Sequence, residues 1–297
     1  MGDLSIITGE RIQTLADVSV ITEDVRQFHT SLSTIKTKLA IVGGSFQGVL
    51  AWDELPVELK RAQVFFVYTH LLKDFFRSIF PALKHPIILL THNSDGSVTE
   101  EFRPFLDGAG IVAWYGQNTA IEHEKLTSLP IGLANAQWKH GCLRELEEVV
   151  NEGAEKTKLI YANFDSSTNV QSRQHLWDAL SREKFVTIGE RKPFKEYLRE
   201  MSGHRFCVAP PGNGLDCHRT WECLYLGVIP VLKRDLHHQQ FEELPILFVD
   251  HWGEVNEDYL NEVYDEMNSI KFDLRKLDLG YWRRRVEKNR VEVLRRT

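Results

Sequence analysis

The stretch PPGNGLDCHRTWECLYLGVIPVL, residues 210–232, holds a loop, a helix and the start of a strand in direct succession. Two prolines end the apolar run 204–210, because proline cannot donate to a strand ladder. Two glycines follow, which permit backbone conformations closed to other residues. From His218 the apolar positions recur with helical spacing, and Gly227 is suited to end the helix before an aliphatic strand over 228–234. This pattern predicts one β-loop-α-β segment of a parallel sheet.

The same alternation of short apolar runs and helical patterns extends in both directions. It predicts strands at 38–44, 62–70, 85–95, 110–118 and 126–133, and then at 158–165, 184–190, 204–210, 228–234 and 244–250. Strands that alternate with helices favour parallel sheets covered on both faces. We therefore expect an α/β protein of two facing Rossmann-like domains, residues 1–150 and 151–280, followed by a C-terminal helix over 281–297.

Composition narrows the class of protein. The 297 residues are 42% hydrophobic and 26% charged, and the net charge is −6. These values are typical of a soluble globular protein and give no reason to expect a nucleic-acid or membrane partner. Four scattered cysteines favour a reducing compartment over a disulfide framework. Without a signal peptide pattern or an apolar run of about 20 residues, we expect a cytoplasmic protein.

The start of the predicted helix, after residue 217, is the part of the sequence that indicates a ligand-binding site. Helix N-termini present unpaired N–H groups and about half a positive charge, so they attract phosphate. Arg219 in the first turn adds a guanidinium suited to a diphosphate. Glu222, on the same face three positions later, could accept hydrogen bonds from the hydroxyls of a ribose. Together these features predict a nucleotide-diphosphate site; the alternative is a simple Arg219–Glu222 ion pair.

Other residues of the second half are placed around the same donor site. Asp216 suits a helix N-cap. Asn163, Arg173 and Arg191 come from strand ends or helix starts. Either arginine could add a second contact to the diphosphate; the alternative is that each is an ordinary surface arginine. The candidate donor-binding residues, besides Arg219 and Glu222, are Gly212, Asn213, Gly214, Asp216, His218, Arg173, Arg191 and Asn163.

The motif FCVAPPGNGLDCHRTWECLYLGVIPVL resembles the donor site of exostosin-like glycosyltransferases, and the likeness extends over residues 195–252. The segments LTHNSD, WYGQN and LPIGLANAQWKHG look like parts of small viral or microbial members, a capsid-glycan xylosyltransferase among them. The resemblance implies a GT-B fold, a UDP-sugar donor such as UDP-xylose, a glycan acceptor and inversion at the anomeric carbon. Within it, Arg219 would contact the diphosphate and Glu222 the ribose. Pro211 departs from the family, where a basic residue is common.

A GT-B enzyme would use its first half for the acceptor and the general base. Asp95 and His92, at the end of a predicted strand, are the candidates that could deprotonate an acceptor hydroxyl, although the segment could be only a turn. Acceptor contacts are expected from loop and strand-end residues: Gly44, Trp114, Gln117 and Asn118. An aromatic residue such as Trp114 at a strand end could equally be part of the core.

The chain contains no Asp-x-Asp motif, which GT-A enzymes use to hold a divalent metal. We therefore expect leaving-group stabilisation without a metal or other cofactor. A zinc site of Cys217, Cys223 and His218 matches no standard spacing. Two other functions remain open. GGSFQG is a poor version of the glycine motif of a Rossmann oxidoreductase, and a non-catalytic nucleotide- or glycan-binding module is compatible with every residue named.

Overall fold

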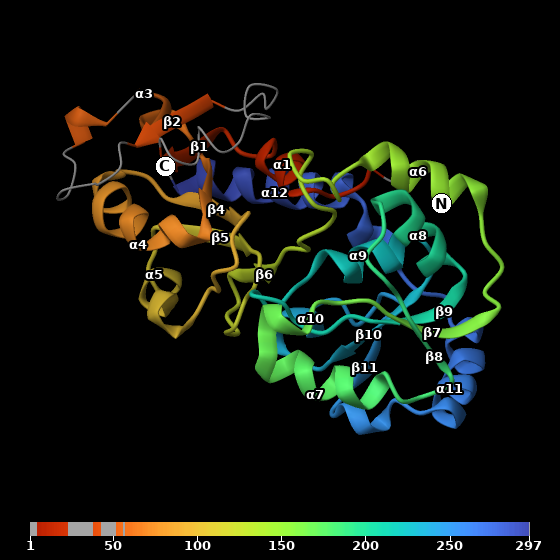
Figure 1. Cartoon of the computed structure of the whole chain (residues 1–297). Helices are drawn as coiled ribbons and strands as arrows, with labels where there is room; N and C mark the ends of the chain where they lie inside the picture. Colours follow the sequence, from red (N-terminus) through yellow and green to blue (C-terminus); the bar gives the residue numbers. More distant parts are fainter. Residues whose placement is uncertain (1–4, 23–37, 43–51, 56, 297) are drawn as a thin grey trace. The chain divides into compact units, whose positions relative to one another are not determined.

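The computed structural model describes residues 5–22, 38–42, 52–55 and 57–296. The chain divides into two compact units, labelled by element in Figure 1. The N-terminal unit comprises residues 7–131 and 279–297, and the C-terminal unit comprises residues 1–6 and 132–278. Each unit is built around one sheet, and every strand pairing that the structure describes is parallel.

The sheet of the N-terminal unit has the strand order β2-β1-β3-β4-β5-β6. Its strands are β1 (Val18–Thr22), β2 (Lys38–Val42), β3 (Val64–Tyr68), β4 (Ile87–His92), β5 (Ile111–Gly116) and β6 (Leu126–Ser128). The helical segments are α1 (Gly9–Gln13), η2 (Trp52–Glu54), α3 (Val57–Arg61), η3 (Thr69–Leu71), α4 (Leu72–Asp74), the π-helix η4 (Phe75–Ile79), η5 (Phe80–Ala82), η6 (Glu100–Phe102), α5 (Arg103–Asp107) and α12 (Leu279–Arg296).

Alternation along β5 separates two layers of this unit. Trp114 is fully buried and lies 5.5 Å from Phe76, centroid to centroid, within a cluster of aromatic rings. The next residue, Tyr115, contacts α12 instead, because its hydroxyl accepts a 2.7 Å hydrogen bond from Asn289. Successive side chains of a strand point to opposite faces, so the sheet is covered by aromatic helical segments on one side and by the C-terminal helix on the other.

The sheet of the C-terminal unit has the order β11-β10-β9-β7-β8. Its strands are β7 (Lys158–Ala162), β8 (Val186–Ile188), β9 (His204–Val208), β10 (Ile229–Lys233) and β11 (Leu247–Val249). The helical segments are α6 (Leu143–Glu152), η7 (Ser166–Asn169), α7 (Val170–Leu180), α8 (Phe194–Ser202), α9 (His218–Tyr225), α10 (Leu236–Gln239), η8 (Trp252–Glu254), α11 (Glu257–Ser269) and η9 (Leu274–Leu277).

The C-terminal sheet is also covered on both faces (Figure 1). Phe206 and Val208 of β9 share one apolar cluster with residues of α7 and α11. Cys207, between them, points the other way, toward Cys223 of α9. Cys223 in turn lies 3.3 Å from the Met201 sulfur of α8. Helices α8 and α9 therefore lie on one face, and α7 and α11 on the other.

The predicted α/β class, the two Rossmann-like units and the C-terminal helix are confirmed, and all ten predicted strands are present. Strand β1 was missed; VSVIT is short and has no glycine or proline beside it. The unit boundary lies at residues 131/132 instead of 150, because α6 packs on α8 through ion pairs such as Arg199–Glu152 at 2.6 Å. The C-terminal helix belongs to the N-terminal unit. No helix in the described part of the chain is long and apolar enough to cross a membrane.

Asp17 connects three parts of the N-terminal unit and gives a stability prediction. One carboxylate oxygen accepts from the amides of Gln63 and Val64 at 2.8 and 2.9 Å, and from Arg290 of α12 at 2.8 Å. Burial opposes the charge, but these donors hold the pKa of Asp17 below its usual value. The side chain is partly exposed, so we expect Asp17→Ala to cost about 2 kcal/mol of unfolding free energy at pH 7.

The measurement is urea unfolding at several pH values. A lowered pKa means that the contribution is present above the unfolded pKa and is lost as pH falls through the folded one. The difference between Asp17→Ala and the parent should therefore shrink toward pH 3 and below. Glu287→Ala removes an exposed ion-pair partner of Arg290 and is the matched control, expected to cost well under about 1 kcal/mol. An equal cost for both variants would contradict this account of Asp17.

Candidate functional site

The C-terminal sheet has a topological switch point between β7 and β9. The chain runs from β7 to its outer neighbour β8 and then returns to the opposite side of β7 as β9. The loops that follow these two strands therefore diverge, and open α/β sheets bind ligands in such crevices at the carboxyl ends of the strands. The loop after β9 is the stretch 209–217, and the segment after β7 is 163–169, which ends in η7.

Arg173 and Asn169 fasten these two loops together. The Arg173 guanidinium donates to the carbonyls of Pro210, Pro211 and Asp165 at 3.2, 2.9 and 3.0 Å. The Asn169 amide donates to the carbonyl of Gly212 at 2.8 Å. Arg173 is 6% exposed and its donors hold the backbone of the loop. Its contact with a diphosphate stays a prediction.

The loop runs close to that guanidinium at residue 212. A Cβ atom added to Gly212 would lie 3.2 Å from an Arg173 nitrogen, which is tighter than ordinary side-chain contacts. Glycine therefore permits the close approach that lets Arg173 reach the backbone. Asn213 is exposed at the tip of the loop and Gly214 is buried behind it. Among the predicted donor-binding residues, Asn213 is thus the one that the loop presents to solvent.

Helix α9 begins directly after this loop and has no side-chain cap at its N-terminus. Its N-cap residue is Cys217, whose side chain makes no capping hydrogen bond; the expected N-cap, Asp216, lies one position earlier. His218 opens the helix, and its Nδ1 donates to the carbonyl of Gly132 at 2.7 Å. The first amides of α9 therefore have no side-chain acceptor at the N-cap, which is the condition under which a helix start binds an anion.

Arg219 lies in the first turn of α9 and is unusually placed. Its Nε is buried and has no hydrogen-bond partner among the described residues. Burial alone would lower the pKa of its guanidinium, but Tyr197, two cysteines and Glu222 raise it above the usual value. A buried guanidinium nitrogen without an acceptor is costly, and in native structures such a group requires an explanation. An anionic ligand would supply the acceptor.

Glu222 lies one turn further along α9 and is 4% exposed. Its Oε2 accepts a 2.8 Å hydrogen bond from the Tyr197 hydroxyl. Burial raises the pKa of Glu222, against the effects of Arg219 and Tyr197. No Arg219–Glu222 ion pair within 4.0 Å occurs among the described residues, so the simple ion-pair alternative is not what the structure shows. Glu222 is oriented by α8 and electrostatically coupled to Arg219.

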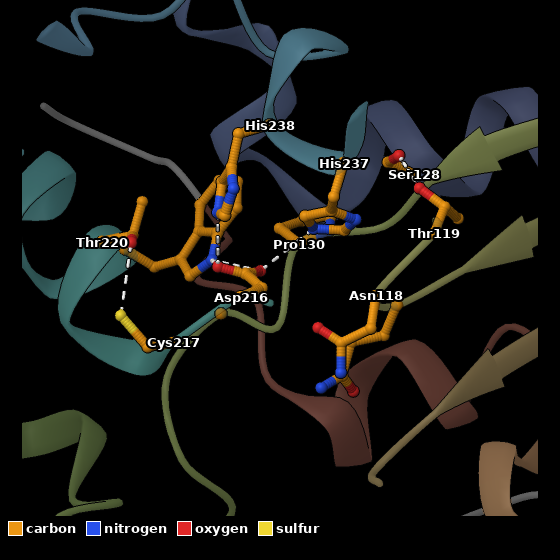
Figure 2. A network of polar contacts seen from close by, with 12 residues as sticks. Asn118, Thr119, Ser128, Pro130, Asp216, Cys217, Thr220, His237 and His238 are labelled. Carbon is orange, nitrogen blue, oxygen red and sulfur yellow. Dashed lines mark hydrogen bonds and ion pairs between the residues drawn. The ribbon is translucent and has the colours of Figure 1, made fainter. Parts of the chain in front are cut away.

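Asp216 is the centre of a buried polar network and not a ligand contact, which corrects its expected role. It is 3% exposed. Trp221 Nε1 donates to both its oxygens at 2.9 and 2.8 Å. His237 and His238 approach it through their Nε2 atoms at 3.4 and 3.2 Å, as Figure 2 shows. Asp235 completes the network by accepting from His238 Nδ1 at 2.6 Å.

The charges of this network follow from its contacts. Burial would raise the pKa of Asp216, but the two histidines hold it well below the usual value. Burial would lower the pKa of His238, but its bonds to Asp216 and Asp235 raise it to about 10. Burial lowers the pKa of His237. His238 is therefore an imidazolium between two carboxylates, and His237 is neutral.

Within the described residues, the same three side chains form a group that could hold a metal ion. The ligand atoms of Asp216, His237 and His238 all lie within 4.8 Å of one another. Each already takes part in a hydrogen bond inside the network, and all three side chains are buried. The alternative zinc site is wrong: Cys223 faces Met201, Cys217 lies 3.5 Å from Thr220 Oγ1, and His218 binds a carbonyl.

Two further donor-site candidates lie after β7 and β8. Asn163 is held by its own unit, since its amide donates to the Tyr161 hydroxyl at 2.9 Å and to the Glu190 carbonyl at 3.1 Å. Arg191 is exposed in the loop before α8. Asn163 therefore positions the β8 loop, and Arg191 remains a candidate for a second phosphate contact.

In the N-terminal unit, the strand ends of β4 and β5 meet as expected. Asn93 and Asn118, just beyond those ends, both have positive φ, 58° and 55°. Gln117 accepts from the Asn93 amide at 3.0 Å and donates to the Ser94 carbonyl at 3.2 Å. Residues held in such sparsely populated conformations concentrate at functional sites. The Asn118 amide likewise faces the carbonyls of the 94–96 turn, the nearest at 3.3 Å.

The two candidate bases differ in access. His92 is 1% exposed; its Nε2 donates to the Pro130 carbonyl at 3.0 Å and its Nδ1 lies 3.0 Å from Asn93 Oδ1. Both ring nitrogens are thus occupied inside the unit, and His92 as a base is wrong for this arrangement. Asp95 is exposed in the turn between the two strained asparagines. It remains the candidate base.

The predicted acceptor contacts divide in the same way. Trp114 as a sugar contact is wrong: it is fully buried and its Nε1 donates to Thr91 Oγ1 at 2.9 Å. Gln117 and Asn118 are buried as well and shape the turn that carries Asp95. Gly44 lies outside the described residues. These side chains support the strand-end loop and do not themselves form a surface.

Tyr68, at the end of β3, is a buried polar group beside Asn93 that the sequence did not single out. It is 1% exposed, and burial raises its pKa above the usual value. A hydrogen bond with Asn93 opposes that shift, and the charge of Glu10 adds to it. In the run AQVFFVYTH, the polar pair Thr69-His70 marks the end of the strand. A tyrosine just before that pair looks like an ordinary core residue, because its ring is apolar and only its hydroxyl is polar.

None of the family models searched matches the chain, and no curated protein matches it. Among solved structures, alpha,alpha-trehalose 6-phosphate synthase from Burkholderia multivorans has 14% identity and a TM-score of 0.37, covering 78% of this chain and 72% of that one. UDP-GlcNAc 2-epimerase from Methanocaldococcus jannaschii, in complex with UDP-GlcNAc and UDP, has 10% identity and a TM-score of 0.39, covering 93% and 99%. Likenesses this distant place the chain in no family.

The Asp216 network yields a pH prediction. A raised pKa means that the stabilisation by His238 is complete below the unfolded value near 6.5 and is lost as pH rises toward about 10. We expect His238→Gln to cost about 3 kcal/mol of unfolding free energy at pH 6 and clearly less at pH 9. Urea denaturation at both pH values measures this difference.

His237→Gln is the matched control. Its lowered pKa means that protonation favours the unfolded chain, so the parent gains stability from this residue as pH rises past 6.5. The cost of His237→Gln should therefore stay level or grow from pH 6 to pH 9. If both variants followed the same trend with pH, the assignment of charge to His238 would be refuted.

Proposed function

We propose that this protein is a glycosyltransferase that moves a sugar from a nucleotide-diphospho sugar to a hydroxyl of a glycan. The observation that carries the proposal is the uncapped N-terminus of α9 with the buried, unpartnered Nε of Arg219 in its first turn. This anion-binding arrangement occurs at the switch point of a parallel sheet. Such a position is where doubly wound sheets bind nucleotides, with the phosphates at a helix start.

The diphosphate would be bound by the first amides of α9 and by the Arg219 guanidinium. When the anomeric carbon–oxygen bond breaks, the electron pair leaves with the terminal phosphate, and negative charge grows there. Fixed N–H dipoles and a guanidinium in a partly buried setting stabilise such a charge more than water does. We propose that these groups stabilise the leaving group without a metal or other cofactor.

Glu222 is proposed to bind the ribose hydroxyls. The helix places it one turn beyond Arg219, which matches the order of diphosphate and ribose along a nucleotide. Tyr197 engages only Oε2, so Oε1 is the oxygen that would accept from a ribose hydroxyl. Its low exposure, 4%, would make this contact a well-desolvated one.

Asp95 is proposed as the general base of the N-terminal unit. It would take the proton of an acceptor hydroxyl while that oxygen forms its bond to the anomeric carbon. Its exposed position on a turn held by Gln117 and Asn118 supports this role over His92. Direct attack of this kind inverts the anomeric configuration. Inversion, a UDP-sugar such as UDP-xylose and a glycan acceptor come from the exostosin-like resemblance.

The donor site is tested by nucleotide binding. We expect Arg219→Ala to weaken the binding of UDP by about 10- to 100-fold, because a charge-assisted hydrogen bond contributes about 1.5–3 kcal/mol. Arg219→Lys, which keeps the charge but not the fork, should fall between. Isothermal titration calorimetry with UDP, GDP and ADP measures the affinity and identifies the base.

Arg182→Ala is the matched control, since it removes an exposed arginine of the same unit. It should leave UDP affinity unchanged, and thermal unfolding should show that all three variants are folded. A parent that binds none of the three nucleotides would refute the proposed function. Unchanged affinity in a folded Arg219→Ala variant would refute this placement of the diphosphate.

The base is tested separately from binding. Asp95→Asn should retain nucleotide affinity and lose about 100-fold or more of the transfer rate, measured as nucleoside diphosphate released in the presence of oligosaccharide acceptors. Glu124→Gln, which neutralises an exposed carboxylate of the same unit, is the control and should transfer at the parental rate. Full activity of Asp95→Asn would remove Asp95 from the mechanism.

A further inference from the structure

Three aromatic rings lie in series beside the N-terminus of α9. Trp138 and His140 have nearly parallel rings, 21° apart, with centroids 6.3 Å from each other. The His140 ring is in turn 6.0 Å from that of His218, the first residue of α9. The three rings, here named the aromatic ledge, therefore end next to Arg219 and its phosphate site, and all three belong to the C-terminal unit.

The backbone around the ledge is held in a defined shape. Trp138 N donates to the Asn135 carbonyl and Gly141 N to the Trp138 carbonyl, both at 2.9 Å. A Cβ atom on Gly141 would lie 2.1 Å from the Asn135 carbonyl oxygen, so only glycine fits there. At the other end, the bond from His218 Nδ1 to Gly132 fixes the third ring. The ledge is a built feature and not a chance cluster on a loose loop.

Trp138 is 45% exposed, which leaves a large flat apolar surface in contact with water. A single exposed apolar side chain is ordinary, but here the tryptophan is stacked along a second ring toward an anion-binding helix start. Burial lowers the pKa of His140, which keeps its ring neutral and able both to donate and to accept. A flat apolar face flanked by neutral polar ring atoms suits the face and hydroxyls of a pyranose.

The order of residues indicates which part of the ligand the ledge would meet. Along α9, Glu222 lies beyond Arg219 toward the C-terminus of the helix, whereas His218 lies before it. In a nucleotide sugar the diphosphate separates the ribose and base from the sugar. With the diphosphate at Arg219 and the ribose at Glu222, the ledge falls on the side of the sugar.

We infer that the aromatic ledge of Trp138, His140 and His218 binds the sugar ring of the nucleotide-sugar donor and thereby contributes to donor selection. The inference rests on the proposed function and deepens it. Trp138 supplies a stacking face for the C–H bonds of the pyranose, and the two histidine rings supply hydrogen-bond partners for its hydroxyls. The nucleobase is the competing occupant, and the experiment separates the two.

The test compares ligands with and without the sugar. Parent, Trp138→Ala and Trp138→Phe are titrated with UDP, UDP-glucose and UDP-xylose, and with the corresponding guanosine or adenosine compounds if the parent prefers another base. We expect Trp138→Ala to weaken the nucleotide sugar about fivefold to tenfold while UDP binding stays unchanged. Trp138→Phe should keep most of the affinity, because it keeps a flat ring.

Each alternative outcome has a distinct meaning. Unchanged nucleotide-sugar affinity in Trp138→Ala would overturn the inference and leave the donor site intact. An equal loss for UDP and for the nucleotide sugar would assign the ledge to the base and also overturn it. A parent that binds no nucleotide would refute the proposed function and this inference with it. Val170→Ala, which removes another exposed apolar side chain of the unit, controls for non-specific effects and should change no affinity.

Discussion

The guanidinium of Arg173 makes the contacts on which the geometry of the C-terminal site depends. It donates to three backbone carbonyls, one in the loop after β7 and two in the loop after β9. A charged donor makes stronger hydrogen bonds than a neutral one, and a buried guanidinium must satisfy its N–H groups. The Arg173 guanidinium therefore holds the two loops of the switch point together. If the loops separated, a buried charge would lose its hydrogen-bond acceptors. The position of the α9 N-terminus follows from that of the loop before it.

A second buried network holds the residue that precedes the N-cap of α9. Asp216, one residue before the N-cap, binds the Trp221 ring nitrogen and two histidines of α10. An acid at the N-cap itself would accept from the first amides of the helix. Because Asp216 precedes the N-cap and its carboxylate is turned into the core, it does not cap α9. The polar residues of the stretch 210–222 thus divide into those that hold the backbone and those that can meet a ligand.

The sequence predicted the sheets well because parallel strands buried on both faces are recognisable as apolar runs, as in HRFCV of β9 and VFFVY of β3. It predicted the loop between β9 and α9 for a similar reason, since proline and glycine mark where a strand ends. The sequence could not predict which residue holds the backbone and which is available to a ligand. Arg173 and Arg219 are both arginines near a helix start, and only the fold shows that one is satisfied by carbonyls and the other is not. His92 and Asp95, three residues apart, are likewise separated only by burial, which depends on long-range contacts such as that with Pro130.

The contrast between the two arginines also bears on energetics. Arg173 loses its hydration in exchange for three carbonyl acceptors, so its burial is compensated within the protein. Arg219 loses the hydration of its Nε without such an exchange. Part of the desolvation cost of binding a phosphate has then been met during folding, and the guanidinium needs little further reorganisation to bind. In a site of lowered dielectric the attraction between the two charges is also stronger than in water. A site of this kind should favour the most highly charged part of its ligand, which in a nucleotide sugar is the diphosphate, and more so once the leaving group has gained its full charge.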